Sequence, residues 1–228
     1  MTANPLRLVV FDMDGTLIDS QNAIMAAMAQ AFGSLGVDLP SREQVLSIVG
    51  LSLEEAAGKL MPDLNTADRR AAARHFEQTF LAMHADGNQP QAPLYRGART
   101  ALETLHGRDE ILMGVATGKS QRGLDNVFAE HDLGRFFVTC QTADFHPSKP
   151  HPSMLHAALS ETGADASQAV LIGDTTYDID MARAAGFRTI AVSWGYHSAT
   201  ALTQAGADIV IDEFSVLQDA LQALWGAE

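Results

Sequence analysis

The sequence predicts an α/β protein with a Rossmann-like parallel sheet core and an inserted all-helical cap domain. The chain has 228 residues, which suits one large domain or a core domain that carries a smaller one. Short apolar runs rich in β-branched residues alternate with segments whose apolar residues recur at helical spacing, a pattern typical of βαβ units. One stretch of about 70 residues interrupts this alternation because it holds helical patterns alone.

The predicted strands are short apolar runs, which favours strands buried on both faces of a sheet. They span residues 6–11, 111–116, 169–172, 189–192 and 208–211, with 136–139 as a weaker sixth. Helical patterns separate most of these runs and follow the last one. These helices are expected over residues 97–105, 121–130, 153–160, 178–185 and 214–224. Strands and helices that alternate in this way form a parallel sheet with helices on both faces.

The interruption follows the first strand and contains four helical segments. They cover residues 21–35, 41–49, 52–60 and 66–84. Glycines and prolines separate these segments, and a turn-rich linker closes the stretch. We therefore expect an α/β core of residues 1–19 and 93–228 and a helical cap of residues 20–92.

The composition excludes several classes of function. With 15 Lys and Arg against 28 Asp and Glu, the net charge is −13 at pH 7, which argues against nucleic acid as a partner because nucleic-acid binders carry basic faces. The single cysteine, Cys140, rules out an internal disulfide and a cysteine-rich zinc cluster. We find no signal-peptide pattern and no apolar run of membrane-spanning length. We expect a cytoplasmic protein.

The first strand runs directly into Asp12 and Asp14, followed by Gly15 and Thr16. Ligands of open α/β sheets bind at the carboxyl ends of strands, so the two carboxylates can converge on one site. Such a carboxylate can bind a hard cation, attack phosphorus to form an aspartyl-phosphate or move protons. A solvated turn explains each aspartate alone, but it explains the whole string poorly.

Two other segments offer groups that bind an anion. The second strand ends in Thr117 and Gly118, where a hydroxyl and successive amides precede a helix. This segment is not a P-loop, because Met113 stands where that motif needs glycine. Lys149 precedes Pro150, which steadies the backbone, and its ammonium suits a phosphoryl oxygen. The ordinary interpretations are a helix entry for Thr117 and a solvated surface lysine for Lys149.

A second acidic run follows another predicted strand. Gly173 and Asp174 come directly after residues 169–172, and Asp178 lies four residues further, about one helical turn. The two acids can face one metal ion together with Asp12. Helix capping and the helix dipole offer another explanation for acids in a first turn. That explanation leaves open why they recur at the same sheet edge as Asp12.

Together these segments resemble the haloacid dehalogenase-like (HAD) phosphohydrolase superfamily, in particular its phosphoglycolate phosphatase-like branch with a helical cap. The superfamily pattern is a D-x-D-G-T strand end, a Thr or Ser strand end, a lysine and a G-D-x-x-x-D run, in that order. Residues 12–16, Thr117, Lys149 and residues 173–178 match it. The resemblance implies a Rossmann-like core, Mg²⁺ as the cofactor and hydrolysis of a phosphoric monoester.

The resemblance also implies roles for the matched residues. Asp12 would be the nucleophile and a metal ligand. Asp14 would be the general acid and base, with its backbone carbonyl on Mg²⁺. Thr117 and Lys149 would hold phosphoryl oxygens, and Gly118 belongs to the same phosphate-binding loop.

For the second acidic run, the resemblance implies that Asp174 binds Mg²⁺ and that Asp178 binds it or orients its ligands. The predicted function is a Mg²⁺-dependent phosphatase that hydrolyses a small phosphorylated metabolite, most similar to phosphoglycolate, through an aspartyl-phosphate. A β-phosphoglucomutase-like mutase or a pyrophosphatase would carry the same motifs. A phospho-aspartate receiver domain is the alternative from another class. Asp14 disfavours it, because a general base beside the phosphate would speed its loss.

The cap is expected to set substrate selectivity. Five basic side chains could meet a substrate carboxylate, although a solvated helix face is the ordinary setting for each. They are Arg42, Lys59, Arg69, Arg70 and Arg74. Gly50 is expected to mark a tight cap turn that faces the site.

Overall fold

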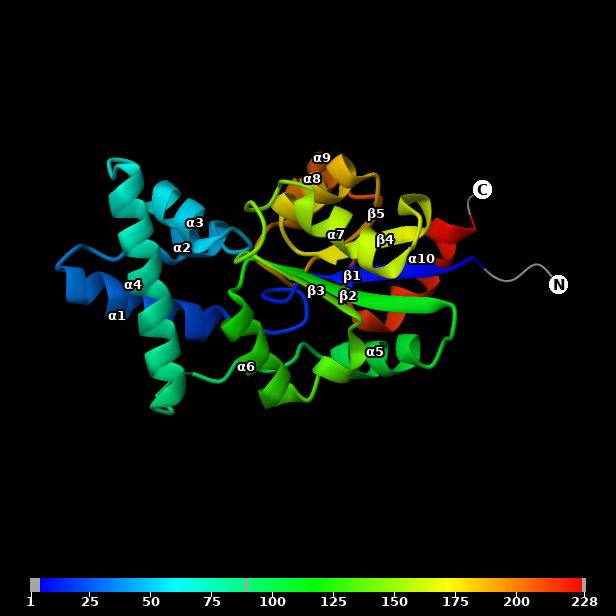
Figure 1. Cartoon of the computed structure of the whole chain (residues 1–228), viewed down its shortest axis with the longest axis horizontal. Helices are drawn as coiled ribbons and strands as arrows, with labels where there is room; N and C mark the ends of the chain where they lie inside the picture. The colour runs from blue at the N-terminus through cyan, green and yellow to red at the C-terminus, as the bar shows by residue number, and fades with distance from the viewer. Residues whose placement is uncertain (1–4, 89, 227–228) are drawn as a thin grey trace.

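The computed structural model describes residues 5–88 and 90–226 and contains a six-stranded parallel sheet. The strands are β1 (Arg7–Phe11), β2 (Ile111–Thr117), β3 (Thr139–Thr142), β4 (Ala169–Gly173), β5 (Arg188–Val192) and β6 (Ile209–Ile211). Their order is β3-β2-β1-β4-β5-β6, so β1 lies between β2 and β4. Figure 1 shows helices above and below the sheet and a separate group of helices at one end.

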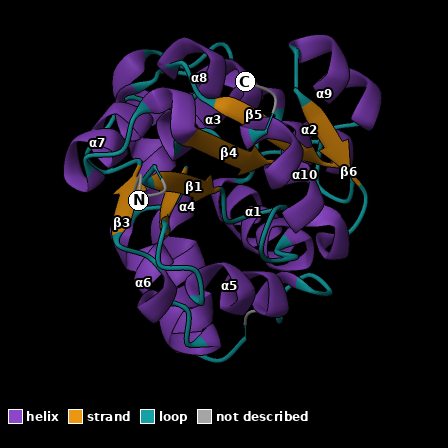
Figure 2. Cartoon of the chain, turned by 90° about the vertical axis from the view of Figure 1, so that its right-hand side faces the viewer, coloured by secondary structure: helices purple, strands orange, loops and turns teal. Residues whose placement is uncertain are grey.

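Helices cover both faces of the sheet. They are α5 (Ala98–His106), α6 (Gln121–His131), α7 (Ser153–Thr162), α8 (Thr176–Ala185), α9 (Ala199–Ala205) and α10 (Leu217–Trp225). Val9 and Phe11 of β1 pack in one core with α5, α6 and α10, whereas Leu8 and Val10 pack in another with α7 and α8. Successive strand residues point to opposite faces, so this strand needs helices on both sides, as Figure 2 shows.

The predicted strand at residues 136–139 is wrong in position, because β3 begins at Thr139. Phe136 instead ends a short 3₁₀ turn, and its ring meets the His106 ring edge-on at 5.5 Å. Phe137 stacks on Phe128 at 5.5 Å between ring centroids. The aromatic pair therefore packs against helices before the strand begins. Helix α9 has no counterpart among the predicted helices, because its 7 residues are too few to show a clear apolar period.

Of the five described helices between β1 and β2, the first four form a layer of their own, at the left of Figure 1. They are α1 (Gln21–Leu35), α2 (Arg42–Ser47), α3 (Leu53–Leu60) and α4 (Thr66–Ala85). Their apolar faces meet in a separate core, where the rings of Phe32 and Phe76 stack at 5.4 Å. Gly36 ends α1 in the left-handed conformation, and the side chains of Ser41 and Asn65 cap α2 and α4. The predicted fold class, a parallel-sheet core with an inserted helical cap, is confirmed.

Two segments of chain connect this helical layer to the sheet, and they lie side by side. The amide of Asp19 donates to the carbonyl of Pro93 at 2.8 Å, and the amide of Tyr95 donates to that of Leu17 at 2.9 Å. This pairing supports the predicted division between core and cap near residues 19 and 93, which remains a prediction. Within the described ranges, no helix combines the length and the apolar character that a membrane span requires.

Candidate active site

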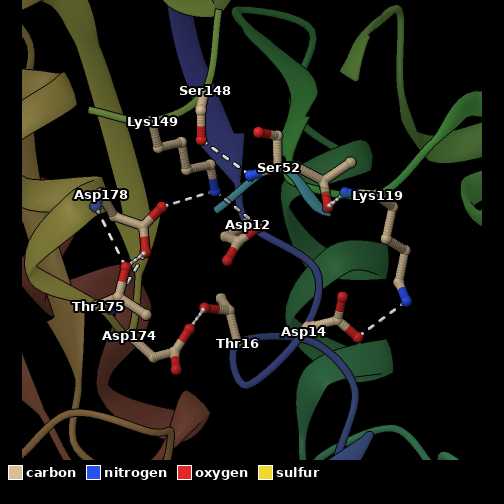
Figure 3. Close-up of polar contacts among 11 residues, drawn as sticks. Asp12, Asp14, Thr16, Ser52, Lys119, Ser148, Lys149, Asp174, Thr175 and Asp178 are labelled. Atoms are coloured by element: carbon tan, nitrogen blue, oxygen red, sulfur yellow. Dashed lines mark hydrogen bonds and ion pairs between the residues drawn. The ribbon is translucent and has the colours of Figure 1, made fainter. Parts of the chain in front are cut away.

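Three polar residues lie at the carboxyl ends of adjacent strands. β1 pairs in parallel with both β2 and β4. Asp12 follows β1, Thr117 ends β2 and Asp174 follows β4, so all three emerge at one edge of the sheet. The side chains of these three residues are buried. The shared edge is the basis of the candidate site, and Figure 3 shows Asp12 and Asp174 in it.

Lys149 joins two carboxylates in this site. Its Nζ lies 2.8 Å from Asp12 Oδ1 and 2.7 Å from Asp178 Oδ1, and all three side chains are buried (Figure 3). Burial by itself lowers the pKa of Lys149, but the charges of Asp12 and Asp178 outweigh burial and raise this pKa. The lysine is therefore a cation at neutral pH. A phosphoryl group that approaches Asp12 also meets this ammonium.

Asp178 and Asp174 are held by different partners. Oδ2 of Asp178 accepts hydrogen bonds from the amide and the hydroxyl of Thr175, at 3.1 and 2.7 Å. Asp174 Oδ1 accepts from the Thr16 hydroxyl at 2.9 Å, and its Oδ2 accepts from the Tyr196 amide at 2.8 Å. Both oxygens of Asp178 are thus engaged, which suits an orienting role. Asp174 accepts one hydrogen bond at each oxygen and keeps free lone pairs for a ligand.

Asp14 lies apart from this cluster and is held by two residues that the sequence analysis did not single out. Its Oδ1 accepts a hydrogen bond from Ser20 Oγ at 2.5 Å and pairs with Lys119 Nζ at 3.0 Å. Ser20 Oγ also lies 2.8 Å from the Tyr196 hydroxyl. The one available signal for Lys119 was its place two residues after Thr117, in the predicted anion-binding loop.

The carboxylates can hold a divalent cation. Asp12, Asp174 and Asp178 each offer an oxygen, and these oxygens lie within 4.8 Å of one another. Asp12 Oδ2 is buried without a hydrogen-bond partner in the described part of the chain, as expected of an oxygen that serves a ligand. Burial, opposed by Lys149, raises the pKa of Asp12 to about 7, and burial likewise raises the pKa of Asp174. A cation would favour both ionised forms, and an all-oxygen donor set fits Mg²⁺.

The cap meets the site at the loop between α2 and α3. The Ser52 amide donates to Ser148 Oγ at 2.8 Å (Figure 3). Gly50 in this loop has a φ of 97°. A Cβ on Gly118 would lie 2.6 Å from the Leu51 carbonyl oxygen and 2.7 Å from that of Gly50. The cap loop therefore rests directly on the predicted phosphate-binding loop, and only glycine at residue 118 permits this approach.

A cavity of about 120 Å³ lies between the cap and the core, and Asp12, Asp14, Thr117, Gly118 and Gly50 contribute to its walls. None of the five basic cap residues considered from the sequence, all of which the structure describes, lines this cavity. Arg42 bonds Gln21, Lys59 bonds Tyr177, Arg69 bonds the Leu64 and Pro62 carbonyls, Arg70 pairs with Glu54, and Arg74 lines a separate cleft. The expected cation for a substrate carboxylate is therefore not found among them.

The parallel sheet thus carries a buried aspartate, a lysine and a cluster of acidic residues at its carboxyl edge, and a helical cap covers that edge. Residues 9–192 match the family described as haloacid dehalogenase-like hydrolase, and the chain belongs to that family. The resemblance stated from the motifs is thus confirmed.

Individual relatives match this chain over nearly its whole length. The chain is 35% identical to the "Probable phosphatase IndB" of Dickeya dadantii, over 95% of this chain and 94% of that protein. It is 28% identical to a phosphoglycolate phosphatase of Photobacterium profundum, over 95% of this chain and 96% of that protein. A solved structure of a predicted phosphatase from Clostridium acetobutylicum has the same fold, with a TM-score of 0.85, 20% identity and coverage of 96% and 100%. The prediction of an enzyme of the phosphatase class is confirmed, and the roles of single residues remain predictions.

Proposed function

We propose that this protein is a Mg²⁺-dependent phosphatase that hydrolyses a small phosphorylated metabolite through an aspartyl-phosphate on Asp12. The environment of Asp12 carries the proposal. Its carboxylate is buried, keeps one oxygen free of protein hydrogen bonds, and lies 2.8 Å from Lys149 and near Asp174. A desolvated carboxylate beside a fixed cation is suited to attack an anionic phosphoryl group. The names of the relatives support the reaction class.

In the first half of the reaction, an oxygen of Asp12 attacks phosphorus, and the bond from phosphorus to the ester oxygen breaks. Lys149, the Thr117 hydroxyl and the amide of Gly118 bind the phosphoryl oxygens. Asp14, in its protonated form, gives its proton to the ester oxygen, which leaves as an alcohol. Asp12 then carries the phosphoryl group as an acyl phosphate.

In the second half, Asp14 accepts a proton from a water molecule, whose oxygen attacks phosphorus. The bond between phosphorus and the Asp12 oxygen breaks, so that Asp12 returns to a carboxylate and inorganic phosphate leaves. Ser20 and Lys119 hold the Asp14 carboxylate in one position, which fixes the direction of both proton transfers. The cap loop at Gly50 covers the site and limits the entry of other water.

Asp12 and Asp174 would hold Mg²⁺ together with the backbone carbonyl of Asp14. When it is bound, the cation neutralises charge on the transferring group and reduces its repulsion from Asp12. Asp178 would act through Lys149, because its Oδ1 lies 2.7 Å from that ammonium and its Oδ2 is bonded to Thr175.

The direct test is the Asp12→Asn variant, assayed for Mg²⁺-dependent phosphate release. We expect kcat to fall roughly 10³-fold or more, because the variant lacks the nucleophile. Asp180→Asn is the matched control, since Asp180 is an exposed aspartate on α8 and should retain wild-type turnover. Wild-type turnover in Asp12→Asn would refute the mechanism.

The substrate is best sought with a screen of sugar, acid and nucleotide phosphates. A phosphoglycolate-like substrate remains the prediction from sequence, and the name of the relative at 28% identity supports it. Transfer of a phosphoryl group between two hydroxyls of a sugar phosphate, without release of phosphate, would point to a mutase. Turnover restricted to pyrophosphate would point to a pyrophosphatase.

A further inference from the structure

The cap side of the active-site cavity is apolar. Its walls on that side come mainly from α1, α4 and the loop that leads into α3. They include Ile24, Met28, Val49, Leu53, Phe76 and Phe80. The volume of about 120 Å³ is close to the roughly 150 Å³ of a known protein cavity that accepts one benzene ring. The cavity also reaches Asp12 and Thr117, so the phosphoryl group takes part of this volume. The remainder has room for a leaving group no larger than a single ring, with apolar surface around it.

The cap contributes one charged side chain to this cavity, among the lining residues that the structure describes, and it is the carboxylate of Glu77. Glu77 is half-buried, and no hydrogen bond or ion pair joins it to another described residue. An unpaired carboxylate at the edge of an apolar cavity disfavours a second negative charge close to it. Glu77 is thus placed to repel substrates whose leaving group is anionic.

The core side of the cavity offers one cation, the ammonium of Lys119, whose charge is already balanced by the Asp14 carboxylate. Lys119 lines the cavity, pairs with Asp14 at 3.0 Å and lies 5.3 Å from the ring centroid of Phe80. A substrate carboxylate drawn to Lys119 would therefore come next to the Asp14 carboxylate. Such a position adds repulsion and disturbs the group assigned to proton transfer, so Lys119 does not provide a favourable carboxylate site.

A second cleft, which borders the cavity, has the same sign of charge. This cleft of about 510 Å³ shares Glu77 and Gly118 with the cavity and is lined by more acids than bases. The acids are Glu54, Glu55, Glu77 and Asp144, and the bases are Arg70, Arg74 and His146. Arg70 is already paired with Glu54 at 3.1 Å. The acid excess adds to the discrimination against a substrate that carries a carboxylate besides its phosphate.

We infer that this site selects phosphate monoesters whose leaving group is uncharged, apolar and no larger than one ring, and that Glu77 is the residue that rejects leaving groups bearing a carboxylate. The inference rests on the proposed phosphatase activity and narrows its substrate class. It predicts that phosphoglycolate, a small ester with a carboxylate, is a poor substrate, contrary to the phosphoglycolate-like substrate that the motifs and the name of one relative suggest.

The test compares three esters on the full chain with Mg²⁺: benzyl phosphate, 4-carboxybenzyl phosphate and phosphoglycolate. All three release a primary alcohol, so their chemistry is matched and the leaving groups differ in size and charge. We expect kcat/KM for benzyl phosphate to exceed that for each of the other two about tenfold or more. Equal or better turnover of phosphoglycolate would overturn the inference and leave the phosphatase proposal standing. No hydrolysis of any phosphate ester would overturn both.

A variant tests the role of Glu77 itself. In Glu77→Gln, which keeps the size of the side chain, the ratio of kcat/KM for benzyl over 4-carboxybenzyl phosphate should fall about tenfold. Glu43→Gln is the matched control, because Glu43 is an exposed carboxylate on α2 that does not line the cavity, and it should keep the wild-type ratio. A ratio in Glu77→Gln that equals the control ratio would overturn the role given to Glu77.

Discussion

Replacing Lys149 with methionine tests how the buried charges of the site are balanced. Its Nζ lies 2.8 Å from Asp12 and 2.7 Å from Asp178, and none of the three side chains is more than 1% exposed. Removal of the Lys149 ammonium leaves the carboxylates of Asp12 and Asp178, which have the same charge, buried away from water. Breaking a buried ion pair in this way typically costs about 3–5 kcal/mol. In a chain of this length, such a loss lowers Tm by roughly 6–20 °C.

The cost depends on pH, and the pKa of Asp12 gives the sign. Burial raises this pKa from 3.8 to about 7, so the folded protein binds a proton that the unfolded chain has already lost. That proton stabilises the metal-free fold at low pH, and the stabilisation is lost as pH rises through about 7. The charge of Lys149 lowers the pKa of Asp12, so this pKa rises further in the variant. Below neutral pH, protonation of Asp12 then removes one of the two buried negative charges. The deficit in Tm should therefore be larger at about pH 8 than at about pH 5.5.

Calorimetry of the metal-free protein at these two pH values measures both effects. Lys59→Met is the matched control, because Lys59 is exposed on α3, where its ammonium donates to the Tyr177 hydroxyl and lies 4.6 Å from the centroid of the same ring. Its stability should change by about 0.5 kcal/mol or less. The reasoning fails if Lys149→Met loses less than about 1 kcal/mol at both pH values, or no more than the control.

Three further results are expected. Mg²⁺ should raise the Tm of the wild-type protein more at about pH 8 than at about pH 5.5, because protons on Asp12 and Asp174 compete with the cation; equal shifts in calorimetry would contradict this. Gly118→Ala should lower kcat/KM roughly 10–100-fold, because its Cβ would meet the carbonyl oxygens of Leu51 and Gly50. Gly33→Ala, where a Cβ meets nothing within 4 Å, should match wild type in the same assay. Lys119→Met should lower kcat about tenfold, because Asp14 loses its ion pair, and steady-state kinetics with unchanged kcat would show that Ser20 alone holds Asp14.

The acidic residues of the site could be predicted because regular structure fixes their position. A buried strand determines which residue follows it, and parallel strands bring those residues to one edge, as Asp12 and Asp174 show. Ser20 and Lys119 were not singled out, because their contact with Asp14 depends on the path of loops that carry no periodic signal. The predicted position of the third strand was wrong because phenylalanine is a residue type that favours strands, whereas Phe136 packs beside a helix in the structure.

The cap residues that line the active-site cavity could not be predicted for a different reason. The residues that fill the cap core and those that line the cavity share one helical pattern. On α4, Phe76 stacks on Phe32 in the cap core, and Phe80, one turn further, lies under Lys119 at the active site. Glu77 stands beside Phe76 and has the pattern of a solvated face, yet it lines the cavity. Which turn of α4 reaches the core depends on how the cap is seated on residues such as Gly118. Chains with the same motifs at the sheet edge can therefore differ in substrate through one turn of this helix.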